Sequence, residues 1–108
     1  MRPVGKPIYS ILEDEVELHE AVSDFVLALA ERVDRLQDLH STADFAQLAE
    51  QCGEIGDDAE QLGYPLLASL SRAAASVCRE SNAPASEEAL IELTALAQRV
   101  RQAHRGAA

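Results

Sequence analysis

Five side chains in this 108-residue sequence are best suited to nucleophilic or metal-binding chemistry: His19, His40, His104, Cys52 and Cys78. His19 lies among carboxylates in "ELHEAV", but no second histidine follows four residues later to complete a metal-binding pair on a helix. The two cysteines are too few and too far apart along the chain for a zinc ligand set or a redox pair. We therefore predict small buried side chains for both cysteines, no metal site, no cofactor and no enzyme activity.

The remaining chemistry is dominated by carboxylates, because 19 acidic side chains against 9 basic ones give a formal net charge of −10. Charge runs on helices are usually solvated faces, and this excess repels nucleic-acid phosphates and anionic lipids. It favours solubility or a partner with a basic surface. The first residues, "MRPVGKPIYS", hold no apolar run of signal-peptide length, and no segment is apolar enough to span a membrane. We expect a cytoplasmic protein that binds neither nucleic acid nor membranes.

Apolar side chains recur at intervals of three and four, which predicts amphipathic helices over about 14–39, 43–62 and 64–79 and a fourth helix after Ser86. The predicted core stripes are Leu18, Val22, Phe25, Val26, Leu29, Val33, Leu36 and Leu39; Phe45, Leu48, Cys52, Ile55, Ala59 and Leu62; Leu67, Leu70, Ala74, Val77 and Cys78; and Leu90, Leu93, Leu96, Ala97 and Val100. Short connections between long helices make neighbours antiparallel. The sequence predicts a single domain over 1–108 with its core in about 7–104, folded as an all-α, up-down-up-down four-helix bundle.

The ends of these helices also carry sequence signals. Ser41 or Thr42 is the expected N-cap of the second helix, and Ser86 that of the fourth. Gly63 occupies the position of a left-handed C-cap residue, and Pro65 suits the first turn of the third helix. The segment "PIYSIL" is expected to form a short lead-in helix that covers one end of the core.

One stretch does not fit a plain helix: "EQCGEIGDDAEQLGYP" carries Gly53 and Gly56 one turn apart inside the second predicted helix. An interior glycine costs a helix about 1 kcal/mol relative to alanine. One explanation is that the glycines ease close packing of helices. Another comes from a family that this stretch resembles.

The stretch resembles the histidine-containing phosphotransfer domain, a four-helix bundle that relays phosphoryl groups in bacterial two-component signalling. Typical members carry Ala-His-x-Leu-Lys-Gly in the second long helix, followed by a Leu/Tyr-Gly-Phe/Tyr-Pro turn. This chain has Cys52-Gly53-Glu54-Ile55-Gly56-Asp57 and then Leu62-Gly63-Tyr64-Pro65 at the same spacing. The resemblance covers about residues 7–80, with "TADFAQLAEQ" as the lead-in to the histidine position.

The resemblance implies a site that has lost its chemistry. The phosphoaccepting histidine of the family falls on Gly53, its lysine on Gly56 and its small glycine on Asp57. Gly53 has no side chain to phosphorylate, Gly56 supplies no cation, and Asp57 adds negative charge beside Glu50, Glu54 and Asp58. Neither His19 nor His40 falls at the matching position.

The resemblance therefore implies a pseudo-phosphotransferase of phosphorelay type that acts by protein–protein contact with a histidine kinase, a response regulator or a related signalling protein. Its expected docking surface includes Glu50, Gly53, Glu54, Gly56 and Asp57. The alternatives are a structural bundle without a signalling partner and phosphotransfer through a non-standard histidine, which would be His19, His40 or His104. An enzyme that uses the scattered carboxylates or His19 is a further, weaker alternative. The sequence leaves the oligomeric state open.

Overall fold

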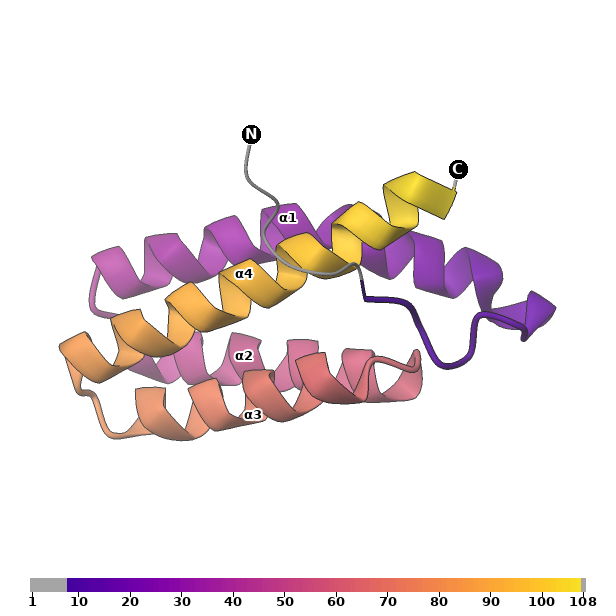
Figure 1. Ribbon diagram of the computed structural model, residues 1–108. Helices are drawn as coiled ribbons and strands as arrows, with labels where there is room; N and C mark the ends of the chain where they lie inside the picture. Colours follow the sequence, from indigo (N-terminus) through magenta and orange to yellow (C-terminus); the bar gives the residue numbers. More distant parts are fainter. Residues whose placement is uncertain (1–7, 108) are drawn as a thin grey trace.

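The computed structural model describes residues 8–107 and the side chains of residues 8–104. A short 3-10 helix, η1 (Val16–Leu18), leads into α1 (His19–Ser41), which is followed by α2 (Phe45–Gln61), α3 (Pro65–Arg79) and α4 (Ala83–Ala107). Each long helix runs antiparallel to the next, and within the described residues the backbones lie closest between α1 and α2, α2 and α3, α3 and α4, and α1 and α4 (Figure 1). The structure confirms the predicted all-α four-helix bundle.

The core is aliphatic, and it follows the predicted stripes closely. Leu29, Leu48, Leu67 and Leu93 are each at most 1% exposed and represent the four helices at its centre. Leu39, Phe45, Leu62 and Leu70 pack against the core while staying partly exposed. With few aromatic residues to bury, the core gains its largest aromatic contact at one end, where the rings of Phe25 and Tyr64 lie 6.0 Å apart. This contact joins α1 to the start of α3.

Two predicted helix caps are wrong. Asp44, and neither Ser41 nor Thr42, caps α2: its Oδ1 accepts a hydrogen bond from the backbone N–H of Gln47 at 3.2 Å. α1 continues through Ser41 because the chain reverses only at Ala43, whose φ is +58°.

The cap at the start of α4 also lies earlier than expected. The side chain of Asn82 accepts a hydrogen bond from the N–H of Ala85 at 3.0 Å, and the helix begins at Ala83. Ser86 is not the cap. It is fully buried within the first turn, where its own N–H donates to the Asn82 carbonyl at 2.9 Å.

The segment before α1 differs most from expectation. "PIYSIL" forms no helix from Ile8 onward (Pro7 lies outside the described residues): the chain is irregular to Ser10 and then turns over residues 11–14. Ile8 packs on the core, but Tyr9 is 54% exposed. We call residues 8–14 the N-terminal strap, because they run from α4 to the turn between α2 and α3 (Figure 1).

Backbone hydrogen bonds hold the strap in its non-helical path. The N–H of Ile8 donates to the carbonyl of Arg99 on α4 at 3.1 Å, and the N–H of Ile11 donates to the carbonyl of Gly63 at 2.8 Å. These two bonds fix Ile8 on α4 and Ile11 on the α2–α3 turn, so the strap runs between these two elements. The predicted start of the first helix at about residue 14 is therefore early: η1 begins at Val16, and α1 begins at His19.

Candidate functional site

The two glycines of α2 occupy different environments. A Cβ built on Gly53 meets no atom within 4 Å, so this position faces open space. A Cβ built on Gly56 would lie 3.0 Å from Cγ of Arg72 and 3.3 Å from the carbonyl oxygen of Ala68, both on α3. Close helix packing therefore explains Gly56 and does not explain Gly53.

Glu50, Gly53, Glu54 and Asp57 follow one another at helical spacing on α2, and we call them the acidic stripe. Glu50, Glu54 and Asp57 are exposed, and Gly53 is partly exposed between them. Among the described residues, Glu50 and Glu54 have no hydrogen-bond or ion-pair partner. The stripe thus presents free carboxylates on both sides of a position that lacks a side chain.

Arg72 supplies a cation that the sequence analysis missed. Its Nη2 bonds Oδ1 of Asp57 at 3.0 Å, and its Nη1 bonds the carboxylate of Glu60. These two carboxylates raise the pKa of the Arg72 guanidinium further above its usual value. Gly56 itself carries no cation, as expected, but its missing side chain leaves room for the stem of Arg72 to cross α2. The available signal was the isolation of Arg72, which is the only charged residue of α3 before Arg79.

Asp57 and Asp58, although adjacent, belong to different contacts. Asp57 is held by α3 through Arg72. Asp58 points the other way and accepts a hydrogen bond from Nη1 of Arg32, on α1, at 2.8 Å. The guanidinium of Arg32 also lies 6.0 Å from the centre of the Phe25 ring. Asp58 therefore joins α2 to α1 and is not part of the acidic stripe.

None of the three histidines lies on α2 or α3. His19 starts α1, and its Nε2 donates to the carbonyl of Glu13. His40 lies in the last turn of α1 and donates from Nε2 to the carbonyl of Ala83 at 3.1 Å. His104, on α4, has its Nε2 3.4 Å from Oγ of Ser23. Each imidazole thus has a local structural contact away from the stripe.

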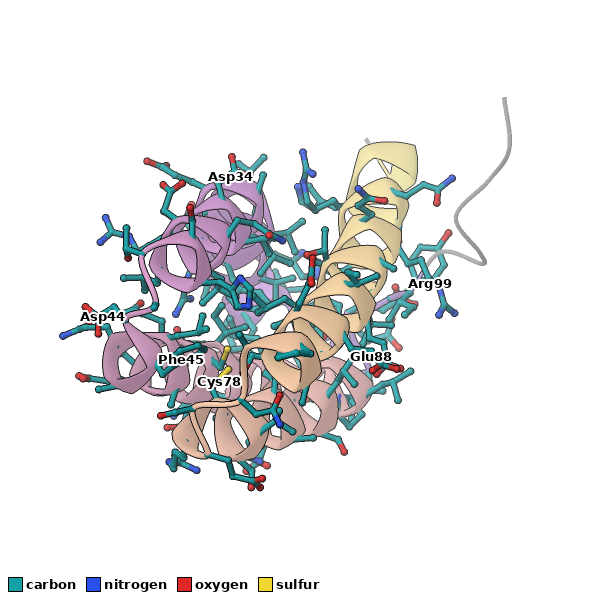
Figure 2. All side chains as sticks on the ribbon, turned by 90° about the vertical axis from the view of Figure 1, so that its left-hand side faces the viewer. Asp34, Asp44, Phe45, Cys78, Glu88 and Arg99 are labelled. Carbon is teal, nitrogen blue, oxygen red and sulfur yellow. The ribbon has the colours of Figure 1, made fainter. Side chains whose placement is uncertain are left out.

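The cysteines correct one sequence prediction. Both are fully buried, as expected, but their separation along the chain does not keep them apart, because the antiparallel pairing of α2 and α3 brings Cys78 close enough to affect the pKa of Cys52. Figure 2 shows the sulfur of Cys78 inside the bundle, while Asp34 and Glu88 project outward. Burial, and then the neighbouring Cys78, raise the pKa of the Cys52 thiol to about 12. The protonated pair is chemically inert at neutral pH.

The turn that follows the stripe has the predicted geometry. Gly63 has φ +86°, and the N–H of Tyr64 donates back to the carbonyl of Ala59 at 2.8 Å, which closes α2 in a Schellman arrangement. Pro65 then starts α3 at a first-turn position. Oγ of Ser10 donates to the carbonyl of Leu62 at 2.6 Å, so the strap is fastened directly to this turn.

Residues 8–107 contain neither a metal-ligand cluster nor a membrane-spanning helix. No group of three or more histidine, cysteine or acidic side chains is arranged to hold a metal ion in that part of the chain. In the same residues, no helix has the length and apolar character needed to cross a membrane.

Comparisons of the chain with protein-family models, with curated proteins and with solved structures give no match. The resemblance to phosphotransfer domains therefore rests on the sequence alone, chiefly on the residues of α2 and the following turn.

Proposed function

We propose that this chain is a cytoplasmic pseudo-phosphotransfer protein, which binds a signalling partner through α2 and α3 and does not accept a phosphoryl group. The observation that carries the proposal is the position of Gly53. It lies on the open face of α2, where a side chain would meet nothing within 4 Å, on a bundle of the expected architecture. A nucleophile there would be accessible, and none is present.

The histidine geometry supports the loss of phosphotransfer. A histidine that donates from Nε2 to a carbonyl holds its proton on that nitrogen, so in His19 and His40 only Nδ1 retains a lone pair for attack on phosphorus. His104 is partly buried against Ser23. None of them lies on α2 or α3.

The charge of the stripe supports a partner with a basic surface. Arg72 neutralises part of the charge of Asp57 and Glu60, whereas Glu50 and Glu54 stay unpaired within the described residues. Like charges that face each other across an interface cost several kcal/mol. A receiver or kinase surface that is itself acidic would dock poorly here, and a basic one would dock well.

Restoration of the nucleophile tests the proposal. We expect Gly53→His to fit without strain, because the position is open, and Gly56 should be kept because a lysine there would collide with Arg72. Phosphoramidate serves as donor: the imidazole nitrogen attacks phosphorus, and ammonia leaves. Gly53→His, alone and with Asp57→Gly, should gain acid-labile phosphate at residue 53, located by mass spectrometry.

The matched control is Ala46→His, which places an exposed histidine elsewhere on α2. If residue 53 gains no more phosphate than residue 46, the correspondence with the phosphotransfer site fails. Acid-labile phosphate on His19, His40 or His104 of the parent chain, delivered by a kinase or receiver, would overturn the proposed incompetence.

The docking surface is tested by charge reversal. Glu50→Lys with Glu54→Lys should abolish co-purification of a kinase or receiver from native lysate. The control, Glu88→Lys with Glu92→Lys, reverses an equally spaced and exposed pair on α4 and should leave co-purification unchanged. Equal recovery with both double variants would exclude the acidic stripe as the docking surface. Recovery of the chain alone would favour a structural bundle without a signalling partner.

A further inference from the structure

A cavity of about 490 Å³ lies at the end of the bundle where the N-terminal strap crosses from α4 to the α2–α3 turn. The strap forms one wall, the first turns of α1 form the second, and the last described turns of α4 form the third. Cavities of about 300–1,000 Å³ are the usual size for small-molecule sites. This cavity is separate from the acidic stripe, which lies on the outer face of α2.

The walls are mainly apolar. Ile8 of the strap, Val22 of α1 and Ala103 of α4 contribute aliphatic surface, and the ring of Tyr64 closes the inner end. Tyr64 is only 4% exposed and is supported from behind by Phe25, so this end is rigid. Small-molecule sites typically combine such apolar walls with a few placed polar groups.

The polar groups lie on two sides of the cavity. Ser23 and His104 contact each other across α1 and α4, with 3.4 Å between Oγ and Nε2. On the strap side, Glu13 lies close enough to Tyr64 that its charge adds to burial in raising the pKa of the phenol. The backbone carbonyl of Glu13 is meanwhile bonded to His19, which fixes the position of this residue.

The charged side chains that line the cavity indicate which class of ligand it would bind. Glu13 and Asp14 are the acidic residues among the described lining side chains, and no lysine or arginine is found among them. A neutral ligand would leave these carboxylates unused, and an anion would be repelled by them.

We propose that this cavity binds a small organic cation, namely an amine carried on an aromatic or branched aliphatic body. The body fills the space between Val22, Ala103 and Tyr64, and the ammonium group bonds the carboxylate of Glu13. Such a ligand contacts the strap, α1 and α4 together, so its binding also stabilises the closed position of the strap. This inference is independent of the proposed signalling function.

The test uses three probes of the same shape with different charge: phenethylamine, 2-phenylethanol and 3-phenylpropionate. Each is titrated into the full chain and followed by chemical-shift changes of backbone amides and of the His19 and His104 imidazoles. We expect phenethylamine to shift the resonances of the strap, of the start of α1 and of the end of α4. The alcohol should bind at least 5-fold more weakly, and the carboxylate should not bind.

Three variants separate a built site from general attraction to an acidic protein. Glu13→Gln should weaken phenethylamine binding about 10-fold, which corresponds to the loss of one charge-assisted contact. Glu54→Gln removes an exposed carboxylate outside the cavity and should change nothing. Val22→Phe fills the cavity and should abolish binding, while circular dichroism checks that the helices persist.

Three results would overturn the proposal. They are equal affinity for the amine and the carboxylate, equal loss in Glu13→Gln and Glu54→Gln, or no localised shift with 10 mM phenethylamine. If Val22→Phe does not fold, the comparison of Glu13→Gln with Glu54→Gln still decides the question, because both of these residues are exposed.

Discussion

Arg72 of α3 crosses α2 at Gly56, with its Cγ only 3.0 Å from where a Cβ of residue 56 would lie. The arginine stem can cross here because residue 56 has no side chain. This crossing places the guanidinium at Asp57 and Glu60. A cation remains beside the acidic stripe, although it comes from the neighbouring helix.

Replacing each of the two glycines of α2 with alanine should change the free energy of unfolding in opposite directions. Gly53→Ala should raise the free energy of unfolding by about 1 kcal/mol, because it adds helix propensity without a steric contact. Gly56→Ala should lower it by about 1 kcal/mol, because overpacking against Arg72 and the Ala68 carbonyl exceeds the same gain. Urea denaturation of the two variants measures both changes.

A double variant tests whether the contact with Arg72 causes the loss of stability in Gly56→Ala. Arg72→Ala in the Gly56→Ala background should restore part of the loss, since it removes Cγ and leaves the Ala68 carbonyl, at 3.3 Å, as the nearest of the remaining neighbours. Equal stabilisation by Gly53→Ala and Gly56→Ala would show that α2 and α3 are not packed as closely as described.

Arg72 should contribute little to stability through its charge. Its side chain is 44% exposed, so water screens both ion pairs, and Arg72→Met should lower the free energy of unfolding only slightly. Because exposed pairs weaken with ionic strength, the difference should shrink in 1 M NaCl. Arg79→Met, at the exposed end of α3, is the control and should be neutral. A large loss of stability that persists in high salt would mean that the pairs are effectively buried.

Gly63→Ala should be strongly destabilising, by about 2 kcal/mol or more. The residue has φ +86°, and its Cβ would lie 2.5 Å from Oγ of Ser10 and 3.0 Å from the backbone nitrogen of Leu12. Ser10→Ala should cost about 1 kcal/mol through the lost hydrogen bond to Leu62. The double variant should cost less than the sum of the two, because Ser10→Ala removes the nearest clashing atom. Strict additivity in thermal unfolding would argue against contact between the strap and the turn.

Because of the buried Cys52 thiol, we expect the free energy of unfolding to fall at alkaline pH. The unfolded thiol loses its proton near pH 9, whereas the folded one keeps it until about pH 12. Between these values the unfolded state binds fewer protons, so raising the pH lowers the free energy of unfolding by about 1.4 kcal/mol per unit. The contribution is fully present below pH 9. Urea unfolding from pH 8 to pH 11 should show a steeper decline for the parent than for Cys52→Ala.

A second measurement checks the same burial without a mutation. Iodoacetamide at pH 8 should label both cysteines rapidly in urea and neither of them in the folded protein. Rapid labelling of folded Cys52, or parallel pH profiles for the parent and Cys52→Ala, would contradict the buried thiol pair.

The sequence predicted the helices well because periodicity alone determines which face of a helix is buried. It failed at the N-caps of α2 and α4, where several residues are of a suitable type and the loop conformation determines which one becomes the cap. Ala43 and Ser81 adopt φ of +58° and +55°, a conformation usually signalled by glycine, so the two chain reversals were not visible in the sequence, although the end of α3 at Arg79 was predicted. Asp44 and Asn82 become the caps because each directly follows one of these reversals.

The part of the site that lies on α2 alone could be predicted from the sequence, and the part that depends on contacts between helices could not. The open face at Gly53 and the carboxylates around it follow from helical spacing. The crossing of Arg72 over Gly56 and the contact of Cys52 with Cys78 depend on how α3 folds back on α2. In each pair, one residue precedes Gly63 and the other follows it by a similar number of residues. An antiparallel hairpin about this turn therefore brings the two members of each pair together.

The closeness of α2 to α3 has a kinetic consequence. These helices share the most extensive interface of the bundle and are joined by the short turn at Gly63, whereas α1 and α4 meet only after most of the chain has been laid down. Local contacts form at a smaller loop-closure cost than distant ones. Folding should therefore nucleate in the α2–α3 hairpin and finish with the docking of α1 on α4. Amide hydrogens of the hairpin would then be the last to exchange with solvent.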